Sequence, residues 1–248
     1  MAERILVGVT TGGPSCAALN WAVHRARAMN AALTLEYVAA EIESGDDPVR
    51  DAVEHCTTLG VSALSRVMHG HAVTTLVRES AEFDLLVVGS HHTGYLHGRV
   101  LGTRSVVIAA AASCSVIVVP EDNVALRRGV VVGVALGDRS DGAILEGARE
   151  ASRRNEELSL IHSSSSNESE AREALVRAAA LASGAAPETV VRRRFTRRRA
   201  SEALLDASRT AALLVLGRSA VDRDVPGHIG TVMHEVLLNL NSPVMIAR

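Results

Sequence analysis

The chain has 248 residues, of which 47% are hydrophobic and 22% charged, which is typical of a globular protein with buried cores and excludes a disordered or disulfide-scaffold protein. Its 26 basic and 28 acidic residues give a formal charge of −2, so no overall positive field favours nucleic acid or a membrane surface. Every one of the basic residues is arginine, which excludes chemistry that depends on a catalytic or phosphate-binding lysine.

In the first half of the chain, apolar runs alternate with amphipathic segments. The run Ile5–Val9 follows the N-terminus without a signal-peptide core and predicts a buried parallel strand. Apolar residues recur at helical spacing in Ser15–Met29, which predicts a helix. The further strands are predicted near Leu33–Val38, Ser62–Met68, Leu85–Val88 and Val116–Val119, and the further helices near Pro48–Leu59, Val73–Glu82 and Thr103–Ala112.

The second half of the chain repeats this pattern. Ile5–Val9 corresponds to Val130–Val134 at an offset of 125 residues, and Leu86–Gly89 corresponds to Leu214–Gly217 at an offset of 128. Such matches in the same order indicate an internal duplication. We therefore predict two domains of the same kind, 1–122 and 128–248, with the boundary in the polar stretch that follows Pro120.

Five strands that alternate with four helices in each copy predict an α/β fold. We expect two repeated, open, doubly wound five-stranded parallel sheets with helices on both faces. In such sheets the ligand crevice lies beyond the carboxyl ends of the strands, where the direction of winding reverses. The residues that follow the first and fourth strands are therefore the candidate ligand site.

A glycine-rich loop follows the fourth strand and runs from Gly89 to Thr103, with glycines at Gly94, Gly98 and Gly102. Glycine permits close approach of a ligand to the backbone, and the helix that begins at Thr103 offers free N–H groups and a positive dipole end. The loop is either a phosphate cradle or a surface loop that ends in an ordinary threonine N-cap. These residues alone leave both interpretations open.

The loop resembles that of the universal stress protein family in its tandem two-domain form, and the resemblance extends across essentially the whole chain. The family signature after the fourth strand is Gly-x2-Gly-x9-Gly-Ser/Thr. Gly89, Gly102 and Thr103 fall on it in the first half, where His92 takes the second glycine position. In the second half the corresponding positions are Gly217, Ala220, Gly230 and Thr231.

The resemblance implies the strand order 3-2-1-4-5 and a pocket for a nucleotide of the ATP type, usually with Mg²⁺. Both halves depart from the binding pattern at the end of the first strand, where nucleotide-binding members carry an aspartate and this chain has Thr10 and Ala135. His92 or His91 can offset part of the loss by donating a hydrogen bond or a charge to phosphate. The first site is therefore expected to bind more strongly than the second.

Carried over residue by residue, the resemblance implies a first pocket in which the backbone at Val38 faces the adenine. The loop and the helix start would hold the ribose and the phosphates. The alternative for Val9, Thr10 and Val38 is simple packing at the strand ends. The implied nucleotide-binding residues are Gly8, Val9, Thr10, Val38, Val88, Gly89, His91, His92, Gly102, Thr103, Arg104 and Ser105, with Gly217, Gly230 and Thr231 in the second half.

Other chemistry finds little support in the sequence. His69 and His71, like the pair His91-His92, lack further ligands at metal-binding spacing, so no metal site is predicted. Paired carboxylates and an activated nucleophile are also missing, so the chain is not expected to be an enzyme beyond very slow ATP hydrolysis. The three cysteines share no paired spacing and are predicted to be small buried thiols in a reducing compartment: Cys16, Cys56 and Cys114.

Six arginines cluster within Arg192–Arg199, on the predicted third strand of the second half and the start of the next helix. In the implied strand order this strand lies at the edge of the sheet, where charges prevent pairing with another edge. The alternative is a contact with a polyanion or an acidic partner.

Two classes of function remain. The first is a regulatory nucleotide-binding protein of the stress response that acts mainly through the first domain, and the retained glycine spacing favours it. The second is a nucleotide-independent scaffold with degenerate pockets, favoured by Thr10, His92, Ala135 and Ala220. Because family members commonly pair through their fifth strands, self-association or an intrachain pseudo-dimer is also expected. With no apolar stretch long enough to span a bilayer, the chain is expected in the cytoplasm, without a membrane or a specific nucleic acid as partner.

Overall fold

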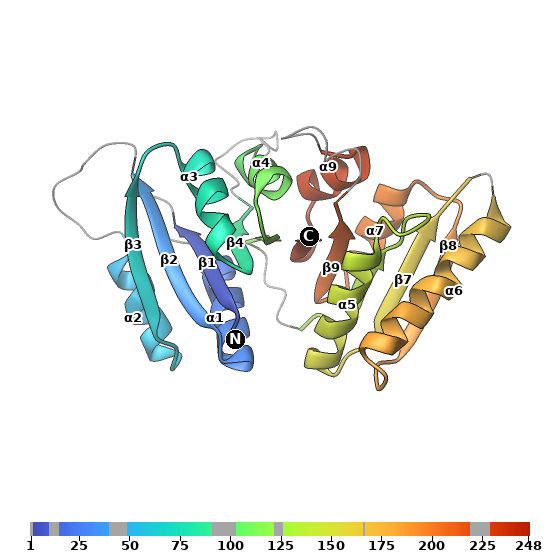
Figure 1. Cartoon of the computed structure of the whole chain (residues 1–248), viewed down its shortest axis with the longest axis horizontal. Helices are drawn as coiled ribbons and strands as arrows, with labels where there is room; N and C mark the ends of the chain where they lie inside the picture. The colour runs from blue at the N-terminus through green and yellow to red at the C-terminus, as the bar shows by residue number, and fades with distance from the viewer. Residues whose placement is uncertain are drawn as a thin grey trace. The chain divides into compact units, whose positions relative to one another are not determined.

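The computed structural model of the chain describes residues 2–9, 15–39, 49–90, 103–121, 126–165, 167–218 and 229–248, with only the backbone of Thr103 (Figure 1). The chain divides into two compact units, Met1–Glu121 and Asp122–Arg248. Each unit contains parallel strands with helices packed against them.

The first unit alternates strands and helices in the order that its apolar pattern predicts. Its elements are β1 (Arg4–Val9), α1 (Cys16–Met29), β2 (Ala32–Ala39), α2 (Arg50–Thr58), β3 (Ala63–His69), α3 (Ala72–Glu79), the 3-10 turn η1 (Ser80–Glu82), β4 (Leu85–Gly89), α4 (Thr103–Ala111) and β5 (Ser115–Val119).

The second unit has the same alternation of elements. They are β6 (Val130–Gly133), α5 (Asp141–Arg154), β7 (Leu158–Ser163), α6 (Glu168–Ala185), β8 (Val191–Thr196), α7 (Ala200–Ser208), β9 (Leu213–Gly217), α9 (Thr231–Leu238) and β10 (Val244–Ala247).

One predicted helix is divided in the structure. The apolar pattern predicts a single helix over Val73–Glu82, but α3 ends at Glu79 and η1 follows it. The hydroxyl of Ser80 donates to the carbonyl oxygen of Val77 at 2.6 Å and accepts from the backbone N–H of Ser113 at 2.7 Å. A serine that bonds to nearby backbone in this way competes with continuation of the helix.

The strands of each unit pair in parallel, in the order β3-β2-β1-β4-β5 in the first unit and β8-β7-β6-β9-β10 in the second. Numbered within a unit, both orders are 3-2-1-4-5, which confirms the predicted doubly wound sheets. The winding direction reverses between β1 and β4, and again between β6 and β9. Such a reversal opens a crevice at the carboxyl ends of the two strands concerned.

Glycines at the strand ends show which helix covers which face of the first sheet. A Cβ placed on Gly8 would lie 3.0 Å from Leu76 of α3 and 3.5 Å from Val88. A Cβ on Gly89 would lie only 2.6 Å from the Cβ of Ser15, whose hydroxyl caps α1. Because successive strand residues point to opposite faces, α1 and α3 cover opposite faces of this sheet.

The second unit repeats this arrangement. A Cβ on Gly133 would lie 2.9 Å from Leu216 and 3.3 Å from Leu204 of α7. A Cβ on Gly217 would lie 3.0 Å from the carbonyl oxygen of Arg139, just before α5. The last glycine of the fourth strand therefore lets the first helix of each unit begin close to the sheet.

Two further observations concern the helices and the cysteines. Across the residues that the structure describes, no helix is both long and apolar enough to cross a membrane. Cys56 and Cys114 are buried, as predicted, but Cys16 is exposed. The prediction for Cys16 was wrong because this residue opens α1 on the side of the helix that faces solvent.

We predict that Gly89→Ala destabilises the first unit. The new Cβ would meet Ser15 at a distance that requires the start of α1 to move, and overpacking of this kind lowers the free energy of unfolding by about 1–3 kcal/mol. Chemical denaturation of the full chain measures the change.

Gly184→Ala is the matched control, because Gly184 lies in α6 with no atom within 4 Å of the position that its Cβ would take. This substitution is expected to raise the free energy of unfolding by about 0.5–1 kcal/mol. Equal effects of the two alanines would contradict the packing argument.

Candidate functional site

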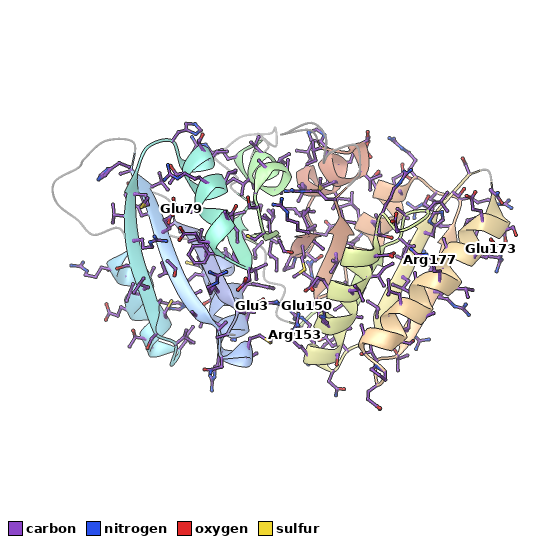
Figure 2. The ribbon with its side chains drawn as sticks, viewed as in Figure 1. Glu3, Glu79, Glu150, Arg153, Glu173 and Arg177 are labelled. Atoms are coloured by element: carbon purple, nitrogen blue, oxygen red, sulfur yellow. The ribbon has the colours of Figure 1, made fainter. Side chains whose placement is uncertain are left out.

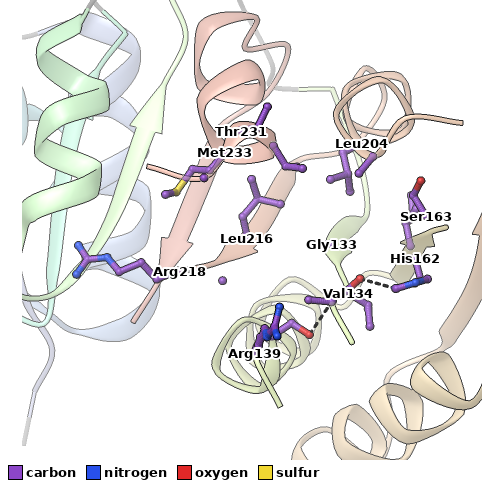
Figure 3. Close-up of a pocket in the computed structure, with 17 residues that line it drawn as sticks. Gly133, Val134, Arg139, His162, Ser163, Leu204, Leu216, Arg218, Thr231 and Met233 are labelled. Carbon is purple, nitrogen blue, oxygen red and sulfur yellow. Dashed lines mark hydrogen bonds between the residues drawn. The ribbon is translucent and has the colours of Figure 1, made fainter. Parts of the chain in front are cut away.

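A cavity of about 390 Å³ opens in the second unit, at the carboxyl ends of β6, β7 and β9 (Figure 3). It lies where the winding of this sheet reverses, which is the expected place for a ligand in a doubly wound fold. The lining residues come from four strand ends or connections and from the starts of α7 and α9. They are Gly133, Val134, Ala135, Arg139, Ser140, Ile161, His162, Ser163, Ala200, Leu204, Leu216, Gly217, Arg218, Gly230, Thr231, Val232 and Met233.

The inner part of this cavity is apolar. Leu204 from α7, Leu216 from β9 and Ile161 from β7 are buried side chains that line it. Figure 3 shows Leu204 and Leu216 on the α7 and α9 side of the sheet. Leu216 and Leu204 pack closely over Gly133, in the space that a side chain there would need. The space suits a flat apolar group such as a nucleobase.

Polar groups lie at the outer part of the cavity. Gly230 is the N-cap of α9 and provides no side-chain cap, so the N–H groups at Thr231 and the next two residues face the cavity end of the helix. These N–H groups and the positive end of the helix dipole favour an anion. The exposed Arg139 adds a positive charge to the same lining.

Two hydrogen bonds fix the ends of β6 and β7 beside the cavity. The Ser140 hydroxyl accepts from the backbone N–H of Ala135 at 3.1 Å. The Nδ1 atom of the buried His162 lies 2.8 Å from the carbonyl oxygen of Val134. Because a carbonyl oxygen only accepts, Nδ1 of His162 is the donor in this hydrogen bond.

The predicted residues of the second half are brought together in this cavity. Gly217 ends β9, while Gly230 and Thr231 begin α9, and all three line the same space. The close approach of Gly217 to Arg139 also gives this glycine a packing role that requires no ligand.

Several predicted residues of the first half lie at the corresponding strand ends. Gly8 and Val9 end β1, Val38 is near the end of β2, and Val88 and Gly89 end β4. In α4, which begins at Thr103, Arg104 is exposed and Ser105 is buried. Four further predicted residues lie outside the described residues: Thr10, His91, His92 and Gly102.

The duplication relates most of the cavity to the first unit. Fourteen of its seventeen lining residues have counterparts in the described part of the first unit at the offsets found in the sequence. The sequence interpretation named only Gly217, Gly230 and Thr231 in the second half, although the offset was sufficient to carry over the others. Six of the pairs are Gly8 and Gly133, Glu36 and Ile161, Val38 and Ser163, Leu76 and Leu204, Val88 and Leu216, and Gly89 and Gly217.

Glu36 is a carboxylic acid at a position where the second unit has an isoleucine, Ile161. It is fully buried in β2, and neither carboxyl oxygen has a hydrogen-bond partner within the described part of the chain. The nearest cation is Arg66 of β3, whose Nη1 lies 4.0 Å from Glu36 and 3.8 Å from Glu79 of α3, labelled in Figure 2. Burial and the nearby Glu79 carboxylate raise the pKa of Glu36 to about 7.

The arginine cluster is largely paired with acidic residues. Its first arginines lie on β8, the last strand in the order of its unit. Its last arginines lie in the loop before α7 and not, as predicted, at the start of the helix. Local neutralisation favours a solvated sheet edge over a polyanion contact. The pairs are Arg192 with Glu157 at 2.7 Å, Arg197 with Glu168 at 2.9 Å, Arg199 with Glu235 at 3.0 Å, and Arg198 with Asp206 and Glu202.

Comparison with known proteins relates the whole chain to one family. A model of the universal stress protein family matches residues 57–120. The chain is 26% identical to a universal stress protein of Mycolicibacterium smegmatis, with 98% of this chain and 96% of that protein covered. It is 27% identical to a universal stress protein of Mycobacterium tuberculosis strain H37Rv, with 98% and 94% covered. The crystal structure of a universal stress protein from Archaeoglobus fulgidus matches this chain with a TM-score of 0.77 at 14% identity. The match covers 100% of this chain and 99% of that chain, so the two proteins share the same fold.

We predict that Glu36 makes the first unit less stable as pH rises from about 4.5 to about 7. Below pH 4.5 the carboxyl is protonated in both the folded and unfolded chains. Between these values the unfolded chain releases the proton and the folded chain keeps it, so the free energy of unfolding falls by about 3 kcal/mol in total. Above pH 7 this contribution stays constant.

The measurement is the free energy of unfolding at about pH 5 and pH 8 for the natural chain and for Glu36→Ile, which introduces the residue of the second unit. The difference between the two chains should favour the variant more strongly at pH 8. A difference that is the same at both pH values would show that Glu36 does not titrate in this range.

Proposed function

Since the chain belongs to the universal stress protein family, we propose that it is a regulatory protein of the stress response that binds a nucleotide of the ATP type at the carboxyl edges of its sheets. The regulatory effect would come from nucleotide binding itself. The protein would hydrolyse ATP very slowly or not at all. The proposal includes a cytoplasmic location and the first domain as the main site.

The observation that carries the proposal is the cavity of the second unit. Its volume of about 390 Å³ lies within the range of small-molecule sites. Its apolar interior between Leu204, Leu216 and Ile161 suits a base, and the start of α9 suits phosphate. The ligand would lie with the base over the sheet and the phosphates toward Thr231.

In the first domain, the same strand ends and the start of α4 would provide the site. The ends of β1, β2 and β4 correspond to the strand ends that line the second cavity. Their proposed binding residues are Gly8, Val9, Val38, Val88 and Gly89. The loop residues His91, His92 and Gly102, together with Thr103, Arg104 and Ser105, complete the proposed set. His92 is proposed to offset the missing glycine through its donor nitrogens.

Magnesium would enter with the nucleotide rather than as a resident ion. None of the described residues that line the second cavity is an aspartate or glutamate. A bound Mg²⁺ would therefore take its ligands from phosphate oxygens and water, as this ion often does. Ala135 offers no side-chain acceptor to a ribose hydroxyl, which is a reason to rank the second site below the first.

A nucleotide-independent scaffold is the second candidate, and the close packing of Gly89 and Gly217 is compatible with it. Both glycines have a structural reason to be glycine, since a Cβ would meet Ser15 in one unit and Arg139 in the other. Their retention is therefore expected with or without a ligand. The two candidates differ in whether the starts of α4 and α9 bind phosphate.

We predict that Thr103→Asp abolishes most of the binding of ATP with Mg²⁺ and that Thr231→Asp abolishes the weaker remainder. An aspartate in the first turn of a helix is compatible with the helix dipole, so the fold is retained. Its charge opposes phosphate and should weaken binding by about tenfold or more. Calorimetric titration of the full chain measures affinity and stoichiometry.

Thr103→Asn and Thr231→Asn are the matched controls, because they change the side chain without adding charge. Loss of binding in Thr231→Asp alone would place the nucleotide in the second domain. Absence of ATP binding in the folded natural chain would overturn the proposal and favour the scaffold.

A further inference from the structure

We propose that Arg177 is a positioning residue of the cavity in the second unit: it holds the connection from β6 to α5 in place and neutralises the acceptor groups there that would repel a bound phosphate. This inference rests on the proposed function and adds to it a residue that does not itself line the cavity. The role falls to a side chain of α6, outside the glycine signature and the strand ends.

The connection from β6 to α5 forms one wall of this cavity. Ala135, Arg139 and Ser140 belong to it and line the space, and Figure 3 shows Arg139 where the connection meets α5. The carbonyl oxygen of Arg139 also lies 3.0 Å from the position that a Cβ on Gly217 would take, at the end of β9. A displacement of this connection would therefore change the cavity directly.

Three hydrogen bonds join Arg177 to this connection. Its Nη1 atom donates to one carboxylate oxygen of Asp141 at 2.9 Å, and its Nη2 atom donates to the other at 2.5 Å. Nη2 also donates to the carbonyl oxygen of Gly137. Figure 2 labels Arg177 on α6, which packs beside α5. Two parallel bonds to one carboxylate fix the direction of approach as well as the distance, which a lysine cannot reproduce.

The bonds within the connection are local, so its position depends on a contact with another element. Gly137 has a φ of 70°, in the left-handed region, and marks a sharp change of direction. The backbone N–H of Asp141 donates to the carbonyl oxygen of Asp138 at 3.0 Å, which closes a turn. Arg177 joins this turn to α6 and thereby fixes its place at the edge of the sheet.

The charge of Arg177 gives the contact a second role. Residues 135–141 contain two aspartates, Asp138 and Asp141, and one arginine, Arg139. This surplus of negative charge would repel a phosphate at the start of α9, which lines the same cavity. Arg177 supplies the balancing charge, and its hydrogen bonds to Asp141 raise the pKa of its guanidinium, with a further contribution from Asp138. The wall is therefore neutral with Arg177 in place and negative without it.

The duplication limits this role to the second unit. Asp141 is the first residue of α5, and Cys16 is the first residue of α1. The two positions correspond at the offset of 125 residues, and a thiol offers no carboxylate to an arginine. Loss of Arg177 is therefore expected to change ligand binding in the second unit and to leave binding in the first unit as it is.

The test measures the dissociation constants of ATP, AMP and adenosine, each with Mg²⁺, in full chains that carry Thr103→Asp, so that the second unit is observed. Arg177→Gln should weaken ATP binding by about threefold or more, AMP binding less and adenosine binding not at all, because the uncovered carboxylate repels only phosphate charge. Arg172→Gln is the matched control, since Arg172 pairs with Glu168 on the same helix and neither residue lines the cavity.

A second substitution separates the effect of charge from a general loss of packing. Asp141→Asn, added to the chain with Arg177→Gln, removes the uncovered carboxylate and should restore most of the ATP affinity. Equal ATP affinities in Arg177→Gln and Arg172→Gln would overturn the inference. So would losses of the same size for all three ligands without recovery by Asp141→Asn, which indicate a purely structural contribution. Absence of ATP binding in the Thr103→Asp chain with Arg177 intact would instead overturn the proposed site of the second unit.

Discussion

The reversal of winding at the first strand of each unit is the constraint on which the rest of the structure depends. β1 pairs with β2 on one side and with β4 on the other, and β6 pairs in the same way with β7 and β9. Parallel strands place all their carboxyl ends on one edge, so the connections after these strands leave that edge in opposite directions. A crevice results whatever the side chains are. The side chains at the strand ends then decide what the crevice can bind.

The two units share some residues at those strand ends and differ at others. The glycines that allow helices to approach the sheet are common to both units, because Gly8 and Gly133 meet a leucine and Gly89 and Gly217 meet the start of the first helix. Beside Gly8 in the strand register, in contrast, the first unit has Glu36 where the second unit has Ile161 beside Gly133. A buried carboxyl lowers stability wherever it lacks partners. Glu36 is therefore expected to lower the stability of the first unit once its carboxyl ionises.

The sequence predicts the fold well because both of its signals are strong. Apolar runs of strand length alternate with helical periodicity, and the duplication checks each element against a second copy. The break between α3 and η1 was not predicted, since it depends on the bond between Ser80 and the distant Ser113. Glu36 was missed for a related reason: within Leu33–Val38 it occupies one position of an apolar strand, and the lack of a partner is visible only when β3 and α3 are in place. The loop residues that the family resemblance singles out lie outside the described residues, so that part of the site stays a prediction.

The signature glycines alone cannot separate a nucleotide site from a scaffold. Packing against Ser15 or Arg139 is sufficient to keep Gly89 and Gly217 as they are, so a domain that had lost its ligand would still carry them. The cavity of the second unit is more informative, because it lies where the winding of the sheet reverses and includes the start of α9 among its lining residues. A phosphate at that helix start would meet backbone N–H groups and the positive end of the helix dipole. Binding of a nucleotide at this place therefore separates the two candidate functions, whereas the glycines do not.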